Sequence, residues 1–259
     1  MKHAADLKIK IFADGADAKR MLELHKNPLI KGFTTNPTLM AKAGVIDYPS
    51  FARQIVSAIH DRPISFEVLS DRFPEMELQA LKISSWGSNV YVKIPITNSQ
   101  GLPSNGLVRR LSRRGVKMNV TAILALDQVQ NIIKCLAYGP SCFVSVFAGR
   151  IADTGRDPVP LMAEAVKLLR PHPNIELIWA SPRELLNIFQ ADAIGCHVIT
   201  ATHDLLTKLN LVGKDLHKYS VETVSMFVRD AREAGLSFDI GNTERLIRTH
   251  RGLQSGSAR

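Results

Sequence analysis

Short apolar segments alternate with helical patterns along the chain, and this alternation restricts the possible folds more than any other feature. Eight segments have the composition of strands, and helical patterns such as the amphipathic stretch 48–60 lie between them. The expected strands are 8–13, 30–33, 64–69, 89–96, 117–120, 142–147, 176–180 and 197–201. Continuously apolar strands separated by helices are typical of a parallel sheet covered by helices. Eight such units in 259 residues predict an α/β protein, a single (β/α)8 TIM barrel with a C-terminal helical extension.

The main alternative is a doubly wound open sheet, which uses the same strand and helix patterns. The phosphate-binding motifs G-x-G-x-x-G and G-x-x-x-x-G-K-[ST] follow none of the predicted strands, which disfavours this alternative. The sequence also contains no domain linker and no low-complexity segment. We therefore expect one domain over residues 1–240, which includes a C-terminal helix at 221–233, and a polar, basic, poorly ordered tail over 241–259.

A net charge of +9 restricts the partners that the chain can bind. A basic balance suits nucleic acid, an acidic surface or small phosphorylated substrates. The basic clusters at 109–114 and 245–259 are not interleaved with aromatic residues, which make up 6% of the chain. A surface that stacks on bases is therefore not expected, and a non-catalytic nucleic-acid-binding protein is the remote alternative.

The sequence indicates a cytoplasmic protein without membrane contact. No apolar run approaches the roughly 20 residues of a membrane span, and the N-terminus has no apolar core of a signal peptide. Cys135, Cys142 and Cys196 are odd in number and lie in apolar surroundings, so we expect reduced thiols. The eight histidines are scattered, with no pair at i, i+4, and no metal site is expected.

Lys93 is a charged residue in an otherwise apolar, β-branched segment, V-Y-V-K-I-P-I over 90–96. An ammonium group is rarely buried without a partner, so this position needs an explanation. One interpretation is a lysine at a strand end whose ammonium reaches solvent. The other is an amine held in a closed site, where it attacks a carbonyl group to form a Schiff base. The strand alone does not decide between them.

Polar residues at the ends of the other strands favour the second interpretation. In a barrel, the carboxyl ends of all strands meet at one face, where the chemistry takes place. The residues at or near these ends are Asp14, Thr34, Asn36, Glu67, Lys93, Asn119, Thr121, Ser145, Arg150, Ser181 and Arg183. An amine with nearby carboxylates suits Schiff-base chemistry on a carbonyl compound. The two arginines suit a phosphate group, because a planar guanidinium binds its oxygens in pairs.

These residues lie in stretches that are similar to a known family. The stretches are FADGAD at 12–17, GFTTNPTL at 32–39, SFEVLS at 65–70, VYVKIPIT at 90–97, VKMNVTAI at 116–123, VSVFAGRIADTGRDP at 144–158, WASPR at 179–183, ITATHDLLTKL at 199–209 and VETVSMFVRDAREAGLSF at 221–238. In this order they resemble the transaldolase family, in its small form that also includes the fructose-6-phosphate aldolases. The resemblance covers about residues 8–238.

The resemblance implies a role for each matching position. Lys93 would form the Schiff base, Asp14 would handle the proton of the C4 hydroxyl, and Glu67 would act on Lys93 through a water that Thr121 also holds. Further residues would contact the substrate. Its hydroxyls or the Schiff-base region would be hydrogen-bonded by Thr34, Asn36 and Asn119, and the pocket would be lined by Ser145 and Phe147. Its phosphate would be held by Arg150, Ser181 and Arg183. Read without the family, Thr34, Asn36 and Ser181 could instead be helix caps and Glu67 a surface strand residue.

Two positions separate the branches of the family. The aldolase branch typically has glutamine at the position of Glu67 and tyrosine at that of Phe147, where the tyrosine hydroxyl helps to protonate the enamine. Both residues here resemble the transaldolase branch. Gly15 departs from the family, which usually has threonine or serine there, and this puts the orientation of Asp14 in question.

The resemblance thus implies a transaldolase of the pentose phosphate pathway. It would transfer a dihydroxyacetone unit from fructose 6-phosphate or sedoheptulose 7-phosphate to an aldose phosphate, with no cofactor. An aldolase that releases free dihydroxyacetone and a related transfer on another sugar stay open as alternatives. Its partners would be small phosphorylated sugars and further copies of the chain, because small members of the family commonly form rings through their C-terminal helix. Packing of the helix at 221–233 against its own barrel is the other interpretation.

Overall fold

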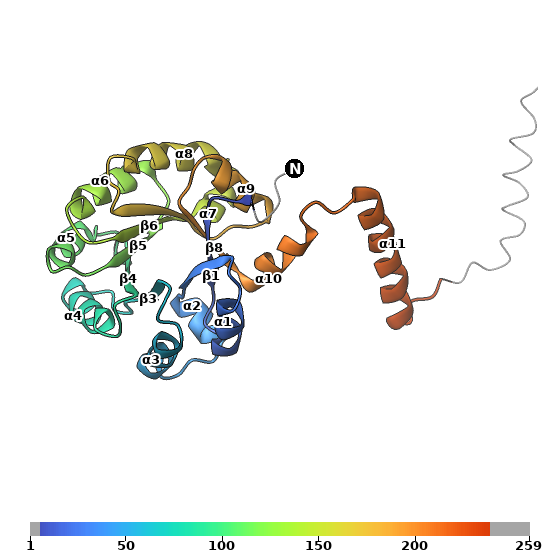
Figure 1. The fold of residues 1–259 in the computed structure, drawn as a ribbon, viewed down its shortest axis with the longest axis horizontal. Helices are drawn as coiled ribbons and strands as arrows, with labels where there is room; N and C mark the ends of the chain where they lie inside the picture. The colour runs from blue at the N-terminus through green and yellow to red at the C-terminus, as the bar shows by residue number, and fades with distance from the viewer. Residues whose placement is uncertain (1–5, 239–259) are drawn as a thin grey trace, which may run out of the picture. The chain divides into compact units, whose positions relative to one another are not determined.

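The computed structural model describes residues 6–238, and its larger part is a closed barrel of eight parallel strands (Figure 1). The strands are β1 (Lys10–Asp14), β2 (Ile30–Thr34), β3 (Ile64–Glu67), β4 (Val90–Pro95), β5 (Met118–Ile123), β6 (Cys142–Val146), β7 (Ile175–Trp179) and β8 (Val198–Thr202). Each strand pairs with its neighbours in sequence, and β8 closes the ring by pairing with β1. The predicted (β/α)8 barrel is confirmed, and the open sheet is excluded.

Helices surround the strands on the outside of the barrel (Figure 1). They are α1 (Ala18–His25), α2 (Pro37–Lys42), α3 (Tyr48–Ala58), α4 (Phe73–Ser84), α5 (Asn105–Arg113), α6 (Leu126–Leu136), α7 (Ala148–Ala152), α8 (Pro158–Leu169), α9 (Leu186–Ala193) and α10 (His203–Leu206), with a 3₁₀ helix, η2 (Thr207–Leu211), after α10. Several begin at signals that can be read in the sequence. For example, Asp157 caps α8 through the Val159 amide, and Pro158 takes the first helical position.

The structure corrects several predicted boundaries. The short helix α7 was not predicted and directly follows β6, and α9 starts and ends a few residues later than the predicted helix at 184–189. The helix expected at 221–233 begins earlier, at Leu216, because the Asp215 carboxylate accepts a hydrogen bond from the Lys218 amide at 2.8 Å.

Two apolar clusters fill the barrel unit. The larger cluster lies between the sheet and the helices and includes the fully buried Trp179, Phe66 and Leu111. The smaller cluster consists of Phe12, Phe143, Ile178, Ala180 and Val198, against which Tyr91 and Phe147 pack. Residues of this cluster, and those that pack against it, precede predicted site residues by two positions, as Phe12 precedes Asp14 and Tyr91 precedes Lys93. Since strand side chains alternate with a period of two, this cluster fills the inside of the barrel beneath the site.

The described residues divide into two units at position 212, and the second unit contains α11 (Leu216–Glu233). Apolar side chains along α11 are exposed, among them Val221, Val224 and Phe227. Association of copies through this helix stays a prediction, and so does the expected domain over 1–240. The predicted tail, 241–259, lies outside the described residues.

The three cysteines are buried free thiols, as predicted. In the described part of the chain, no helix is both long enough and apolar enough to cross a membrane. Neither finding bears on the chemistry of the barrel's mouth.

Candidate active site

A cavity of about 560 Å³ lies at the carboxyl ends of the strands, and every residue predicted for the site lines it. These residues are Asp14, Thr34, Asn36, Glu67, Lys93, Asn119, Thr121, Ser145, Phe147, Arg150, Ser181 and Arg183. Thr200, Lys42 and Thr202 also line the cavity and were not predicted. Its position agrees with the rule that barrel sites lie at the carboxyl-terminal face of the strands.

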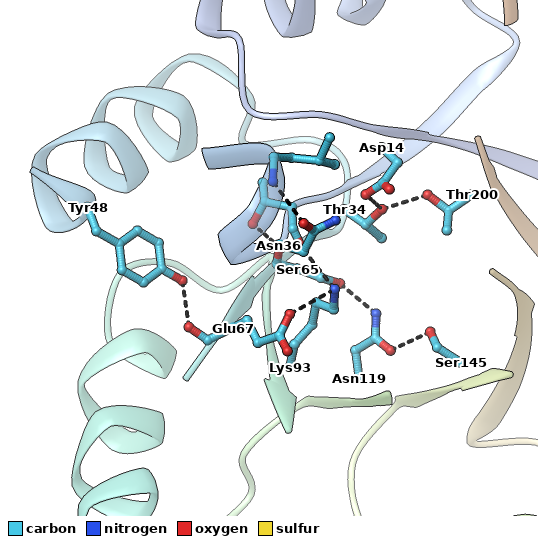
Figure 2. Close-up of polar contacts among 12 residues, drawn as sticks. Asp14, Thr34, Asn36, Tyr48, Ser65, Glu67, Lys93, Asn119, Ser145 and Thr200 are labelled. Atoms are coloured by element: carbon cyan, nitrogen blue, oxygen red, sulfur yellow. Dashed lines mark hydrogen bonds and ion pairs between the residues drawn. The ribbon is translucent and has the colours of Figure 1, made fainter. Parts of the chain in front are cut away.

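Lys93 lines this cavity and is only 6% exposed, so the interpretation that its side chain extends into bulk solvent is wrong. Its Nζ lies 3.1 Å from Oε2 of Glu67 and donates a hydrogen bond to the Thr35 carbonyl at 2.8 Å (Figure 2). In the strand register, Lys93 pairs with Glu67 on β3 and with Asn119 on β5. The predicted partner is therefore correct, but the contact is a direct ion pair and not one made through a water.

Glu67 is also fixed from outside the barrel. The hydroxyl of Tyr48 on α3 donates to the Glu67 backbone carbonyl at 2.9 Å (Figure 2). Burial raises the pKa of Tyr48 well above its usual range, which keeps its proton available for this bond. Glu67 is thus not a surface strand residue, because its carboxylate pairs with Lys93 and its backbone is anchored to α3.

Thr121 has a buried hydroxyl with no hydrogen-bond partner among the described residues. The next residue, Ala122, has a φ of 61°, and the pairing of β5 with β6 shifts register between Val120 and Ile123. A left-handed conformation costs a non-glycine residue about 1–2 kcal/mol, and such strain is found mostly at functional sites. The free hydroxyl and the strained backbone therefore identify this strand end as part of the site.

Asp14 lies across the cavity from Glu67 and is held by Thr34, which in turn contacts Thr200. The Thr34 hydroxyl donates to Oδ1 of Asp14 at 2.7 Å, and it lies 2.6 Å from the hydroxyl of Thr200 (Figure 2). Burial raises the pKa of Asp14, while the Lys93 charge and the Thr34 hydrogen bond oppose that rise. A Cβ atom on Gly15 would meet no other atom within 4 Å, so the packing does not require glycine where the family usually has threonine or serine. The restraint on Asp14 comes from Thr34 instead.

A second buried chain of hydrogen bonds crosses the other side of the barrel. Ser145 donates to Oδ1 of Asn119 at 2.7 Å, and the Asn119 amide donates to the Ser65 hydroxyl at 3.1 Å (Figure 2). Asn36 does cap α2, through the Leu39 amide at 2.9 Å, and also lines the cavity. Its cap role and its place in the site are thus compatible.

The two arginines differ in what they contact. Arg183 is paired with Asp153 through two hydrogen bonds, of 2.8 and 2.5 Å, and donates a third to the Ser181 hydroxyl at 2.9 Å. The Arg183 guanidinium holds the pKa of Asp153 below its usual range. Arg150 lies over the Phe147 ring, 5.7 Å from its centroid, and forms no ion pair within residues 6–238. Asp153 was not predicted, and its position in the stretch 144–158 was the only signal for it.

The loop that carries Ser181 approaches α7 very closely. A Cβ atom on Gly149 would lie 1.6 Å from the Ser181 carbonyl oxygen, and Ser181 has a φ of 60°. Ser181 is not a helix cap, because α9 begins after Leu185. Glycine at 149 and the strained Ser181 thus fix the position of the arginines at this edge of the cavity.

Across residues 6–238, no group of three or more histidine, cysteine, aspartate or glutamate side chains is arranged to hold a metal ion. The polar groups of the cavity are instead one amine, two carboxylates, hydroxyls, amides and two guanidinium groups. Such a set can form an imine, move protons and bind an anion.

These features define a (β/α)8 barrel whose site is built on a buried lysine–glutamate pair. The family described as transaldolase/fructose-6-phosphate aldolase matches residues 11–247, and the chain belongs to this family. This membership supports an enzyme of the aldolase or transaldolase type.

Curated relatives agree with this assignment, and solved structures share the fold. A protein of Dehalococcoides mccartyi named "Probable transaldolase" is 33% identical over 202 residues, which cover 78% of this chain and 90% of the relative. A protein of a Thermoanaerobacter species with the same name is 31% identical, over 88% of this chain and 99% of its own. A solved structure described as native KDPGal has a TM-score of 0.53 at 13% identity, over 89% of this chain and 98% of that one, and shows the fold alone.

Replacement of Gly149 by alanine tests the close approach of α7 and Ser181. We expect Gly149→Ala to lower the free energy of unfolding by at least about 2 kcal/mol, because a backbone oxygen cannot make room for the methyl group. Gly106→Ala in α5 is the control, since its nearest neighbour would be a side-chain nitrogen of Arg110 at 3.7 Å. Urea unfolding measures both, and equal stability of the two variants would contradict the packing described.

Asp14 gives a prediction for stability against pH. Because its pKa is raised in the folded protein, the folded state binds the proton more tightly than the unfolded state, and ionisation of Asp14 costs stability as the pH rises. Asp14→Asn is therefore expected to be more stable than the wild type at pH 7.5, with a difference that disappears as the pH falls towards 3.8, the ordinary value. Thermal unfolding from pH 4 to 8 measures this. A difference that does not change with pH would contradict the prediction.

Proposed function

We propose that this protein is a transaldolase that moves a dihydroxyacetone unit between phosphorylated sugars through a Schiff base on Lys93. The observation that carries the proposal is the buried ion pair of Lys93 and Glu67, which faces a cavity of about 560 Å³. The name "Probable transaldolase" of the relatives supports the same reaction.

The reaction begins when the amine of Lys93 attacks the C2 ketone of a ketose phosphate. Direct contact with Glu67 allows the carboxylate to accept the ammonium proton, which frees the nitrogen lone pair for attack. Loss of water from the carbinolamine then gives the imine. The buried hydroxyl of Thr121 and the Glu67 carboxylate are suited to bind this water, because both line the cavity and the hydroxyl has no protein partner among the described residues.

Asp14 serves the step in which the C3–C4 bond breaks. Its carboxylate takes the proton of the C4 hydroxyl, the aldose phosphate leaves, and the bond electrons pass into the protonated imine to give an enamine on Lys93. The reverse of this step joins the enamine to a second aldehyde. The protonated imine accepts the bond electrons in cleavage, and the enamine donates them to the acceptor carbonyl in addition, so the proposed reaction needs neither a metal nor an organic cofactor.

Arg150 is the principal phosphate ligand in this proposal. Its guanidinium forms no ion pair in the described part of the chain, whereas both edges of Arg183 are engaged by Asp153 and Ser181. A phosphate group binds to Arg150 and the Ser181 hydroxyl, with Arg183 contributing its charge from a fixed position. The basic net charge of the chain favours the approach of such substrates.

Trapping with borohydride tests the assignment of Lys93. With fructose 6-phosphate and borohydride, we expect a dihydroxyacetone-sized mass on the peptide that contains Lys93, detected by mass spectrometry. Lys93→Ala should lose this label and at least about 1,000-fold in kcat, as removal of a nucleophile does elsewhere. Lys31→Ala, which changes an exposed lysine on β2, is the control and should keep both. Labelling and turnover of Lys93→Ala at the wild-type level would refute the proposal.

Phe147 favours transfer over cleavage. Its ring lines the cavity beneath Arg150 and offers no proton to the enamine, which therefore persists until an aldehyde arrives. An aldolase that releases free dihydroxyacetone needs a proton donor near this position.

Substitution of Phe147 by tyrosine tests this difference. With fructose 6-phosphate alone, Phe147→Tyr is expected to release free dihydroxyacetone about 10-fold faster than the wild type or more, because a positioned acid speeds protonation by at least that factor. Phe147→Leu, which removes the ring without adding a hydroxyl, is the control. Rapid release by the wild type without an acceptor would instead identify an aldolase.

A further inference from the structure

Thr200 is a buried hydroxyl that the proposed reaction does not use. It lies on β8, pairs with Phe12 on β1, and is 5% exposed at the wall of the cavity. Its Oγ1 lies 2.6 Å from Oγ1 of Thr34, which in turn lies 2.7 Å from Oδ1 of Asp14 (Figure 2). The three side chains form one line from β8 through β2 to β1.

The direction of the hydrogen bonds in this line follows from the number of protons. A hydroxyl has one proton and so donates once. When Asp14 is ionised, Thr34 donates to it, and the short contact between the threonines requires Thr200 to donate to Thr34. When Asp14 is protonated, its own O–H can donate to Thr34, and Thr34 then donates to Thr200. The line can reverse by rotation of two hydroxyl groups, while all heavy atoms stay in place.

We propose that Thr200 is a positioning residue that holds Thr34 in hydrogen bonds to Asp14 in both protonation states of that carboxyl group. This inference rests on the proposed function, in which Asp14 alternates between these states. A buried polar atom that loses its partner is costly, so a line that stays satisfied in both states lowers the cost of each proton transfer.

Each proton transfer at Asp14 is balanced. In cleavage, the C4 O–H proton moves to Asp14, its electron pair forms the C4 carbonyl, and the C3–C4 pair forms the enamine as the imine nitrogen accepts electrons. In the bond-forming step, the enamine C3 attacks the acceptor carbonyl, and the new C4 oxygen takes the proton from Asp14. Thr200 exchanges no proton with the substrate, and the line changes only its direction.

The matched variants are Thr200→Val, which keeps the shape and removes the hydroxyl, and Thr200→Ser, which keeps the hydroxyl. We expect Thr200→Val to lower kcat, and the single-turnover rate of aldose phosphate release, by about 10-fold or more. KM should stay within about twofold, and Thr200→Ser should stay within about threefold of the wild type in kcat. Thr200→Ala replaces the valine variant if that variant does not fold.

Borohydride trapping on fructose 6-phosphate separates this inference from the proposed function. We expect Thr200→Val to give the wild-type total yield of label on Lys93, counted as uncleaved ketose phosphate plus dihydroxyacetone unit, because imine formation precedes the use of Asp14. Wild-type release rates in Thr200→Val would overturn the role of Thr200, and a loss in Thr200→Ser as large as in Thr200→Val would show that packing, not the hydroxyl, matters. Absence of label in the wild-type protein would refute the proposed function itself.

Discussion

Burial of the Lys93 ammonium is the constraint on which the rest of the site depends. Removing such a group from water costs several kcal/mol, and the charge is stable only where a partner and hydrogen-bond acceptors surround it. Glu67 supplies the charge at 3.1 Å, and the Thr35 carbonyl accepts a hydrogen bond at 2.8 Å. The register of β3 against β4 brings the two charged residues side by side. A slip of one residue would turn one of them away from the cavity and leave the other charge buried alone.

The polar groups around Lys93 rest on an apolar layer. Phe12, Phe143, Tyr91 and Val198 lie two residues before Asp14, Ser145, Lys93 and Thr200, and so point to the same inner side of the barrel. Along these strands, the side chains that point into the barrel therefore change from apolar to polar between one inward position and the next. This layer keeps water from reaching the site from below, so that the hydrogen-bonded lines through Thr34 and Asn119 operate in a medium where hydrogen bonds are strong.

The sequence predicted the barrel and twelve of the residues that line its cavity, because strand ends converge whatever the details of packing, but it missed Thr200 and Thr202 on β8. Contacts between side chains were beyond it. The direct Lys93–Glu67 pair, the engagement of Arg183 by Asp153 and the contact of Tyr48 with Glu67 each depend on distances between elements that no local pattern encodes. Thr200 did carry a signal, since it follows Val198 by two positions as Asp14 follows Phe12. The predicted strand, 197–201, includes Thr200, but Thr200 is not among the predicted site residues.

Backbone strain at the mouth of the barrel has a common physical reason. Ala122 and Ser181 both adopt a positive φ, on opposite sides of β6. Both line the cavity in which the substrate is proposed to bind. Such conformations persist only where the surrounding structure determines them fully, as the contact of Gly149 with the Ser181 carbonyl does here. Strain of this kind is stable because the barrel and its helices bury a large apolar cluster, which offsets a cost of a few kcal/mol. Packing on the outside of the sheet therefore holds Thr121 and the arginines in place before any substrate binds.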